Sequence, residues 1–109
     1  MGVKVKVIKG NDSVILEIRG RISGSDAIMI SKKLETYISQ PITRVALDLS
    51  FLDYLDSTWL GTFIYCMGLY KDNHKELVFI IPDGFILELF NNSNISSIAK
   101  IYKTREDFA

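Results

Sequence analysis

The sequence contains little cysteine and proline, and it has no excess charge of either sign. Cys66 is its single cysteine, which excludes an intrachain disulfide framework and fits a reducing compartment such as the cytoplasm. Lys plus Arg and Asp plus Glu each number 13, so the formal net charge is zero. Proteins that bind nucleic acid or anionic membrane surfaces usually carry clustered Lys and Arg, so we expect neither kind of partner.

Long apolar segments are absent from the sequence as well. The longest, residues 59–70, is well short of the roughly 20 residues that cross a bilayer. The N-terminal segment MGVKVKVIKG alternates valine with lysine, which is typical of neither a signal peptide nor a transit peptide. The hydrophobic fraction is 48%, enough to form a packed core. We therefore expect one cytoplasmic domain over residues 1–109 that does not insert into a membrane.

The first half of the sequence shows strand, turn and helix patterns in turn. Residues 3–7 alternate apolar and charged side chains, the pattern of a half-buried strand, and residues 14–19 repeat it. The Gly-Asn-Asp turn chemistry of residues 9–13 between them predicts an antiparallel hairpin. Apolar residues at three- and four-residue spacing over 26–39 predict an amphipathic helix that ends before Pro41.

The second half continues the alternation of strands and helices. Residues 45–55 predict a central strand, 59–71 a very apolar helix and 76–81 a buried strand. A short helix over 83–92 and a last strand over 99–103 are expected to follow. The inward side chains of that short helix are predicted to be Phe85, Leu89 and Phe90.

The final segment, TREDFA, begins like a capped helix, with Thr104 and Asp107 at capping-box spacing. Because so few residues follow Thr104, we expect no closing helix. The expected order is then β-β-α-β-α-β-α-β. Alternating strands and helices predict an α/β fold with a mostly parallel mixed sheet, flanked by helices, to which the N-terminal hairpin adds an antiparallel edge.

The helix predicted over residues 59–71 has no charged residue before Lys71. On a 3.6-residue period, the arc expected to pack on the sheet comprises Trp59, Leu60, Phe63, Ile64, Cys66, Met67 and Tyr70. The opposite arc comprises Thr58, Gly61, Thr62, Tyr65, Gly68 and Leu69. A surface helix normally carries charge on its outer face, so we expect this arc to be covered by another part of the domain, by a second copy in a homodimer, or by a partner protein.

Asp56, Ser57 and Thr58 stand at the start of this helix. Unpaired N–H groups and the positive end of the helix dipole make such a position suitable for a capping side chain, and either Asp56 or Ser57 can be that cap. The same position tolerates a phosphate, because helix N-termini accept negative charge. A partner docked there would have to bury an unpaired anion, so modification of the hydroxyl would release it. Both interpretations stand at this point.

The stretch VALDLSFLDYLDSTWLGTF resembles the STAS domain, and within that family the bacterial anti-sigma factor antagonists. The resemblance lies in an apolar strand, an aspartate, a short apolar stretch and then Asp-Ser-Thr at a helix start, with Leu60 and Gly61 completing the motif. It extends to ILEIRGRISGSDA, to ELVFIIP and to the closing segment, and so covers nearly the whole chain.

The resemblance implies a protein without enzymatic activity, cofactor or metal, which works by switching partners. In such antagonists an anti-sigma factor that is also a serine kinase phosphorylates the serine after the aspartate, and a metal-dependent phosphatase removes the phosphate. The unphosphorylated form binds the anti-sigma factor and so frees a sigma factor. Carried over to this sequence, the phosphorylated residue is Ser57.

Three features depart from the family pattern: the expected lack of a closing helix, and the residues at two positions. Trp59 stands where a small residue is usual, and Ser23 stands where the family has a carboxylate near the phosphorylation site. An indole beside Ser57 would either contact a partner or obstruct a kinase. The expected partner-binding residues are Ser23, Asp56, Thr58, Trp59, Gly61, Thr62 and Tyr65.

Two other functions remain as alternatives. For an enzyme, the single histidine, His74, would have to reach Ser57 along the length of a helix, and neither a metal-ligand cluster nor a phosphate-binding glycine loop is present. Cys66 lies in apolar surroundings and is expected in the core. The second alternative is a non-switching STAS module of a transporter or signalling complex, in which Ser57 is only a cap.

Overall fold

Within residues 3–109, five strands form one mixed sheet in the order β1-β2-β3-β4-β5. The computed structural model describes residues 3–109; Met1 and Gly2, which belong to the predicted domain range, lie outside the described residues. The strands are β1 Lys4–Lys9, β2 Ser13–Arg21, β3 Arg44–Tyr54, β4 Glu76–Ile80 and β5 Ile101–Tyr102. The helices are α1 Asp26–Thr36, α2 Thr58–Asp72, α3 Phe85–Asn91, the 3₁₀ helix η1 Asn94–Ser97 and α4 Arg105–Phe108.

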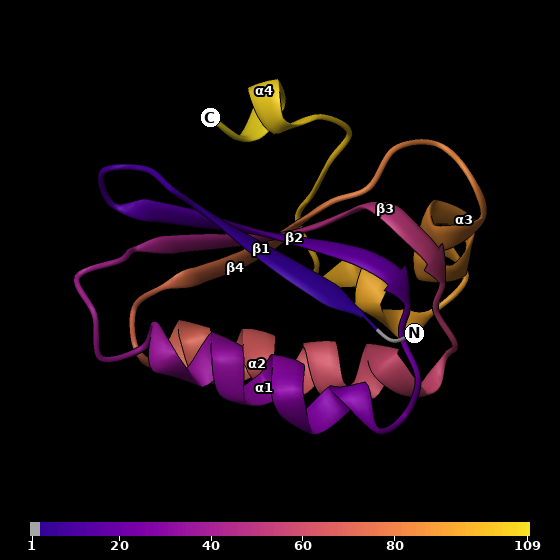
Figure 1. Ribbon diagram of the computed structural model, residues 1–109, viewed down its shortest axis with the longest axis horizontal. Helices are drawn as coiled ribbons and strands as arrows, with labels where there is room; N and C mark the ends of the chain where they lie inside the picture. Colours follow the sequence, from indigo (N-terminus) through magenta and orange to yellow (C-terminus); the bar gives the residue numbers. More distant parts are fainter. Residues whose placement is uncertain (1–2) are drawn as a thin grey trace.

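The sheet topology confirms the predicted α/β fold. β1 and β2 pair as an antiparallel hairpin, and β2, β3, β4 and β5 are parallel to one another. β3 is the central strand, as predicted. Helices α1 and α2 cover one face of the sheet, and α4 lies on the opposite face (Figure 1). Parallel strands need covered faces, and the crossovers through α1 and α2 supply one of these covers.

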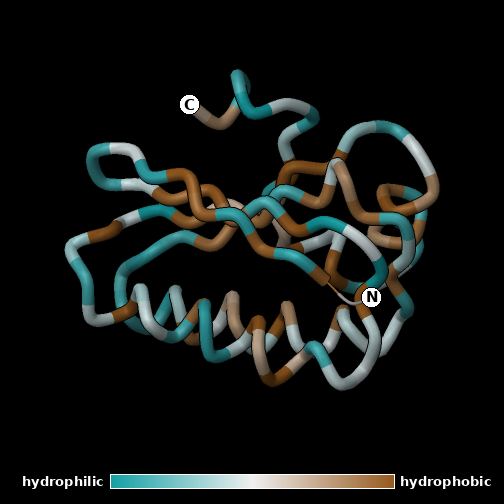
Figure 2. Tube along the Cα trace, in the orientation of Figure 1, coloured by the Kyte–Doolittle hydropathy of each residue, from teal (hydrophilic) through white to brown (hydrophobic). Residues whose placement is uncertain are grey.

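The main core lies between the sheet and helices α1 and α2. Alternate residues of the strands point into it, and hydrophobic segments recur along the strands, interrupted by hydrophilic ones, in Figure 2. An aromatic cluster joins α2 and α3 to the sheet: the Phe63 ring lies 5.7 Å from Trp59, 5.3 Å from Phe79 and 6.1 Å from Phe90, measured between ring centroids. Burial of these large side chains fixes α2 against β4.

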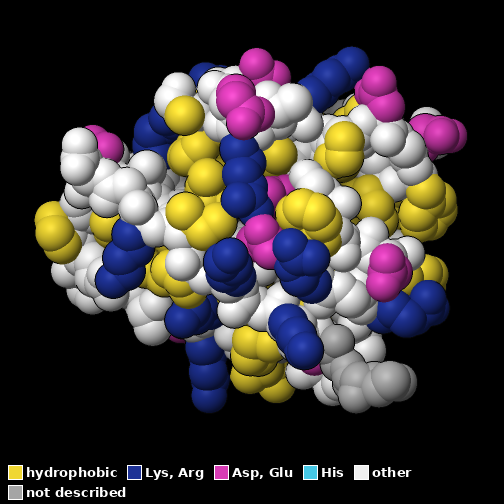
Figure 3. Space-filling view, turned by 45° about the horizontal axis from the view of Figure 1, so that its top comes forward, with side chains coloured by type: hydrophobic (Ala, Val, Ile, Leu, Met, Phe, Trp, Pro, Cys, Tyr) yellow, Lys and Arg dark blue, Asp and Glu magenta, His cyan; other side chains and the backbone are white. Residues whose placement is uncertain are grey.

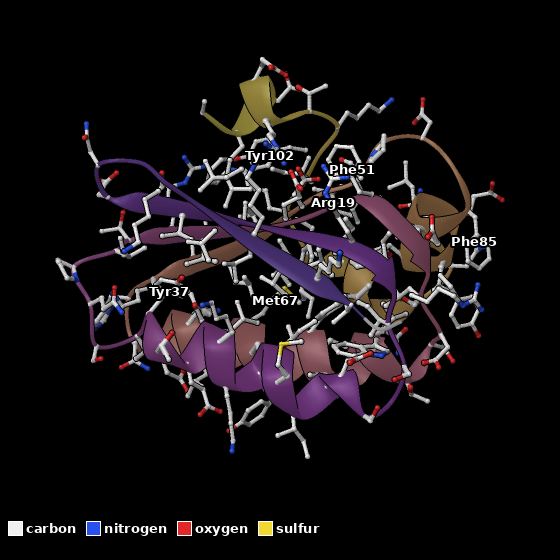
Figure 4. The ribbon with its side chains drawn as sticks, viewed as in Figure 1. Arg19, Tyr37, Phe51, Met67, Phe85 and Tyr102 are labelled. Carbon is white, nitrogen blue, oxygen red and sulfur yellow. The ribbon has the colours of Figure 1, made fainter. Side chains whose placement is uncertain are left out.

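Three details of the predicted helices are wrong. Phe85 was expected inward but is 60% exposed, because Ile86 and Phe90, four residues apart, form the inner stripe of α3. Figure 4 shows the Phe85 ring pointing away from the sheet. Ile64 of α2 is 37% exposed at the edge of its arc rather than packed on the sheet. Helix α1 ends at Thr36, since residues 37–41 form turns.

The expectation that no closing helix forms is also wrong. The side chain of Thr104 accepts a hydrogen bond from the Asp107 backbone N–H at 3.2 Å, which caps the single turn α4. A four-residue helix is not stable alone, and tertiary contacts hold this one. Phe108 is 3% exposed and packs with Ala46, Val78 and Ile80 on the face of the sheet opposite α1 and α2.

A buried ionic network ties α4 to the two central strands. Glu17 of β2 and Asp48 of β3 are 3% and 1% exposed. The Arg105 guanidinium bonds to both carboxylates, at 2.6 Å from Asp48 Oδ2, and Arg19 Nε lies 2.5 Å from the second Glu17 oxygen. Figure 3 shows this side of the molecule, where Lys and Arg side chains lie among hydrophobic ones. Arg19 also lies over the Phe51 ring, 4.1 Å from its centroid (Figure 4).

Protonation of the Glu17 carboxylate at low pH should destabilise the fold. Burial by itself raises the pKa of this carboxyl, but hydrogen bonds from Arg105 and Arg19 and their positive charges outweigh it, so the net pKa is lowered from 4.5. A lowered pKa in the folded state stabilises the protein above the unfolded-state pKa, and that stabilisation is lost as pH falls through the folded-state pKa.

We therefore expect the free energy of unfolding, measured by urea titration, to fall between about pH 5 and pH 3. The Glu17→Gln variant should show a shallower fall over the same range, because one titrating group has been removed. Equal pH slopes in both proteins would show that Glu17 does not contribute.

Candidate functional site

Two loops meet where β2 and β3 end, at the carboxyl edge of the parallel strands. The backbone N–H of Ile22 donates to the Tyr54 carbonyl at 3.3 Å and holds the strand ends together. From there β2 leads through residues 22–25 into α1, and β3 leads through residues 55–57 into α2 (Figure 1). The topology therefore brings the two segments singled out in the sequence, around Ser23 and Ser57, to one end of the molecule.

Asp56 is the residue that caps α2. Its Oδ1 accepts a hydrogen bond from the Thr58 backbone N–H at 3.0 Å and a second from the Thr58 hydroxyl. The sequence left either Asp56 or Ser57 for this role, and the geometry selects Asp56. A capping carboxylate also interacts favourably with the positive end of the helix dipole, so it satisfies the helix start without help from Ser57.

The Ser57 hydroxyl is consequently free. Ser57 is exposed, and within residues 3–109 its side chain makes no capping hydrogen bond. Its backbone conformation, with φ −67° and ψ −18°, is already helical. A phosphate added here would lie at the positive end of the α2 dipole, which tolerates negative charge.

Trp59 was predicted to contact a partner, and that prediction is wrong because the side chain is buried. Its exposed fraction is 1%, and its ring packs beside Phe63 in the core. The indole Nε1–H donates to the Ser23 carbonyl at 3.1 Å, so the one polar atom of the ring is satisfied by the neighbouring loop. The large side chain beside Ser57 therefore does not obstruct access to the hydroxyl.

Ser23 lies beside the start of α2 through this same contact. Its hydroxyl donates to Asp26 Oδ2 at 3.0 Å, and its backbone N–H donates to the same oxygen at 2.9 Å. The Ser23 and Ser25 hydroxyls are 2.9 Å apart. Asp26, the first residue of α1, thus holds the loop, and its carboxylate lies next to Ser23.

The outer face of α2 is uncharged and only partly covered. Gly61 and Tyr65 are exposed, Tyr65 by 62%, and Thr62 is half-buried. Thr62 and Leu69 are half-buried, so within residues 3–109 the domain covers this arc only in part. Gly61 and Tyr65 follow Ser57 at successive four-residue steps and extend its surface along the helix.

Two exposed apolar residues on α1 were not among the predicted site residues. Ile28 is 67% exposed and Met29 is 42% exposed. The run Ala27–Ile30 is entirely apolar, and a helix cannot turn four successive side chains toward one core. That run was the signal that some of them had to face solvent.

The two side chains considered for catalysis lie away from Ser57. Cys66 is 1% exposed, and burial raises the pKa of its thiol, which disfavours the reactive thiolate. His74 is exposed in the turn after α2, with φ +59°, at the opposite end of that helix. Among the helices of residues 3–109, none is long and apolar enough to span a bilayer.

The arrangement of strands and helices is that of a known family, and a family model described as the STAS domain matches residues 3–108. The chain belongs to the STAS domain family. This STAS domain is 26% identical over 93 residues to the anti-sigma-B factor antagonist of Listeria monocytogenes, an alignment that spans 85% of the chain and 82% of the relative.

Two solved structures of SpoIIAA have the same fold as this STAS domain. The unphosphorylated anti-sigma factor antagonist SpoIIAA superposes with a TM-score of 0.79 and 16% identity, over 96% of this chain and 93% of that one. The phosphorylated form from Bacillus superposes with a TM-score of 0.72 and 16% identity, over 96% of each chain. At this identity the similarity shows the fold.

Proposed function

We propose that this STAS domain is an anti-sigma factor antagonist whose partner binding is switched by phosphorylation of Ser57. The unmodified form binds a kinase-type anti-sigma factor and frees a sigma factor. The phosphorylated form releases the anti-sigma factor, and a phosphatase restores the first state. The observation that carries the proposal is the free, exposed Ser57 hydroxyl at a helix start that Asp56 already caps.

The docking surface follows from the outer face of α2. Ser57, Thr58 and Gly61 are small and exposed, so another backbone can approach the first turn closely. Tyr65, one turn further on, offers a large aromatic side chain of the type that often dominates binding energy. Because the Trp59 side chain is 1% exposed, it adds almost nothing to the surface beside the hydroxyl.

The names of similar proteins support the same function. The Listeria relative is named an anti-sigma-B factor antagonist. SpoIIAA has been solved with and without phosphate, so the fold shared with this chain accommodates the modification in that protein.

The switch itself is a phosphoryl transfer followed by electrostatic release. The kinase transfers the γ-phosphoryl group of ATP to Ser57 Oγ; the bond to the bridging oxygen of ADP breaks, and a base of the kinase accepts the hydroxyl proton. The phosphate adds about −1.5 to −2 charges near the carboxylate of Asp56. A docked partner would bury this charge without a countercharge, whereas solvent hydrates it in the free domain.

Intact-mass spectrometry tests the proposal. Incubation with ATP and the kinase-type anti-sigma factor of the same organism should add one phosphate to the chain, and peptide mapping should place it on Ser57. Ser57→Ala should abolish the modification, and the matched control Thr58→Ala should retain it. A phosphate on another residue, or stable binding of the kinase without any transfer, would favour a non-switching module.

Replacing Tyr65 by alanine should weaken binding of the anti-sigma factor by about tenfold to a hundredfold, as expected for an aromatic hot spot. Because Tyr65 is 62% exposed, thermal unfolding should be nearly unchanged. Phe51→Ala is the matched control, since Phe51 is 44% exposed on the α4 side of the sheet. Calorimetric titration gives both affinities; equal values for the two variants would exclude the α2 face as the docking surface.

A further inference from the structure

A groove of about 700 Å³ lies at the end of α2 remote from Ser57. It runs between the C-terminal half of α2, the start of β4 and Ile98, which follows η1. Its volume lies within the range of about 300–1,000 Å³ that is usual for small-molecule sites. The lining residues are Thr43, Ile64, Met67, Gly68, Lys71, His74, Lys75, Glu76, Leu77 and Ile98.

One stripe of α2 forms the long wall of this groove. The stripe begins at Ile64 and continues three, four and seven residues later with Met67, Gly68 and Lys71. At this spacing the four residues lie on one side of the helix. The stripe is about 10 Å long, since each residue advances the axis by about 1.5 Å. The side chains of the stripe are apolar at the Ile64 end, and the stripe ends in the positively charged Lys71. Figure 4 shows Met67 between α2 and the sheet.

The apolar part of the groove is open and lacks a protein side chain to fill it. Ile64 and Ile98 are 37% and 60% exposed, unusually high for isoleucine, and both line the groove. Gly68 lies on the same helix wall as Ile64, and a Cβ built there would meet no atom within 4 Å. The groove can therefore hold an aliphatic chain without displacement of the core.

The other part of the groove is positively charged. Lys71 and Lys75 both line it, and among residues 3–109 neither ammonium group forms an ion pair. Lys75 Nζ donates to the carbonyls of Gln40 and Ile42, which holds its charge in place. The single acidic residue among the lining residues, Glu76, is neutralised by Arg44, whose Nε lies 3.2 Å from the carboxylate.

We propose that this groove binds a medium-chain fatty acid. The aliphatic chain lies along Ile64, Met67 and Ile98, and the carboxylate lies at Lys71, near the charge of Lys75. An aliphatic chain that ends in a single anion matches the change from apolar to cationic along the wall. The site is independent of the proposed switch, because Lys71 is 14 positions, or about 21 Å of helix, from Ser57.

Titration with decanoate below its micelle-forming concentration tests this site. The full chain is isotope-labelled and followed by two-dimensional amide NMR, with Ser57 unmodified and no anti-sigma factor present. We expect saturable shifts centred on Ile64, Gly68, Leu77 and Ile98. Decanol should bind about tenfold more weakly, since it lacks the charge that Lys71 recognises, and Lys71→Ala should weaken decanoate binding by a similar factor.

Gly68→Phe fills the groove and should abolish the decanoate shifts. Because nothing surrounds that position, the variant should remain folded, with the amide spectrum of residues on β2 and β3 unchanged. Gly61→Phe, on the first half of α2, is the matched control and should bind decanoate normally. Absence of saturable shifts, equal affinity for decanol, or unaltered binding by Gly68→Phe would overturn the proposal. Displacement of decanoate by an acidic amphipathic peptide that binds more tightly than decanoate would also overturn the proposal. The groove would then be a peptide-binding site.

Discussion

Ser57→Glu is expected to weaken binding of the kinase-type anti-sigma factor by about a hundredfold or more while the fold remains intact. An unpaired anion buried under a partner costs several kcal/mol, and each 1.4 kcal/mol is a factor of about ten in affinity. The exposed Ser57 side chain makes no capping bond that the substitution could break. A negative charge is also tolerated at the start of α2.

Calorimetric titration against the anti-sigma factor measures the loss, and thermal unfolding followed by circular dichroism checks the fold. Ser57→Gln is the matched control, with the same size and no charge, and it should lose much less affinity. If glutamine and glutamate weaken binding equally, the effect is steric and the electrostatic switch is wrong. A large drop in the unfolding temperature of Ser57→Glu would contradict the account in a different way, because the scaffold was expected to tolerate the charge.

Arg105→Met should lower the free energy of unfolding by about 3–5 kcal/mol. The substitution leaves Glu17 and Asp48 buried with one of their cations removed, and the two carboxylates belong to neighbouring strands. It also detaches α4, whose position depends on this contact and on the Arg44 guanidinium, which donates to the Phe108 carbonyl at 3.1 Å.

Urea unfolding at neutral pH measures this loss of stability. Arg21→Met is the matched control: Arg21 is an exposed arginine of β2 whose guanidinium lies 4.6 Å from the Tyr54 ring centroid, and its loss should cost about 1 kcal/mol or less. If Arg105→Met and Arg21→Met lower the free energy of unfolding equally, the buried network does not hold α4 to the sheet.

The regular part of the fold could be predicted because its signals are local. Alternation over residues 3–7 and 14–19 specified the hairpin, and the 3.6-residue period of residues 59–71 specified α2 within a residue at each end. Its uncharged outer arc was likewise visible in the sequence, and Tyr65 is exposed there as that arc requires. Such patterns depend only on residues that are close together in the sequence, so they can be read without knowledge of the tertiary structure.

The errors arose where distant residues decide the outcome. Trp59, in the first turn of α2, was assigned both to the packed arc and to the partner surface. The Ser23 carbonyl, 36 residues away in sequence, accepts its indole N–H and places it in the core. Helix α4 was missed because Arg105 is anchored by Glu17 and Asp48, and no local pattern in four residues reports that contact.

The candidate site was predicted at Ser57 from its motif, but the motif did not distinguish the capping residue from the residue with a free hydroxyl. Asp56 and Ser57 are adjacent and both are favoured at helix starts, so composition left the two roles interchangeable. The hydrogen bond from the Thr58 N–H to Asp56 separates them. This division of roles leaves the Ser57 hydroxyl without a capping bond, which is what the proposed modification requires.

The most direct measurement compares two forms of one chain, with and without a phosphate on Ser57, in calorimetric titration with the anti-sigma factor. The account predicts tight binding by the unmodified form, binding weaker by about a hundredfold or more for the phosphorylated form, and unfolding temperatures within about 2 °C of each other. Equal affinities for the two forms would contradict it, since a phosphate at the start of α2 would then not control the partner.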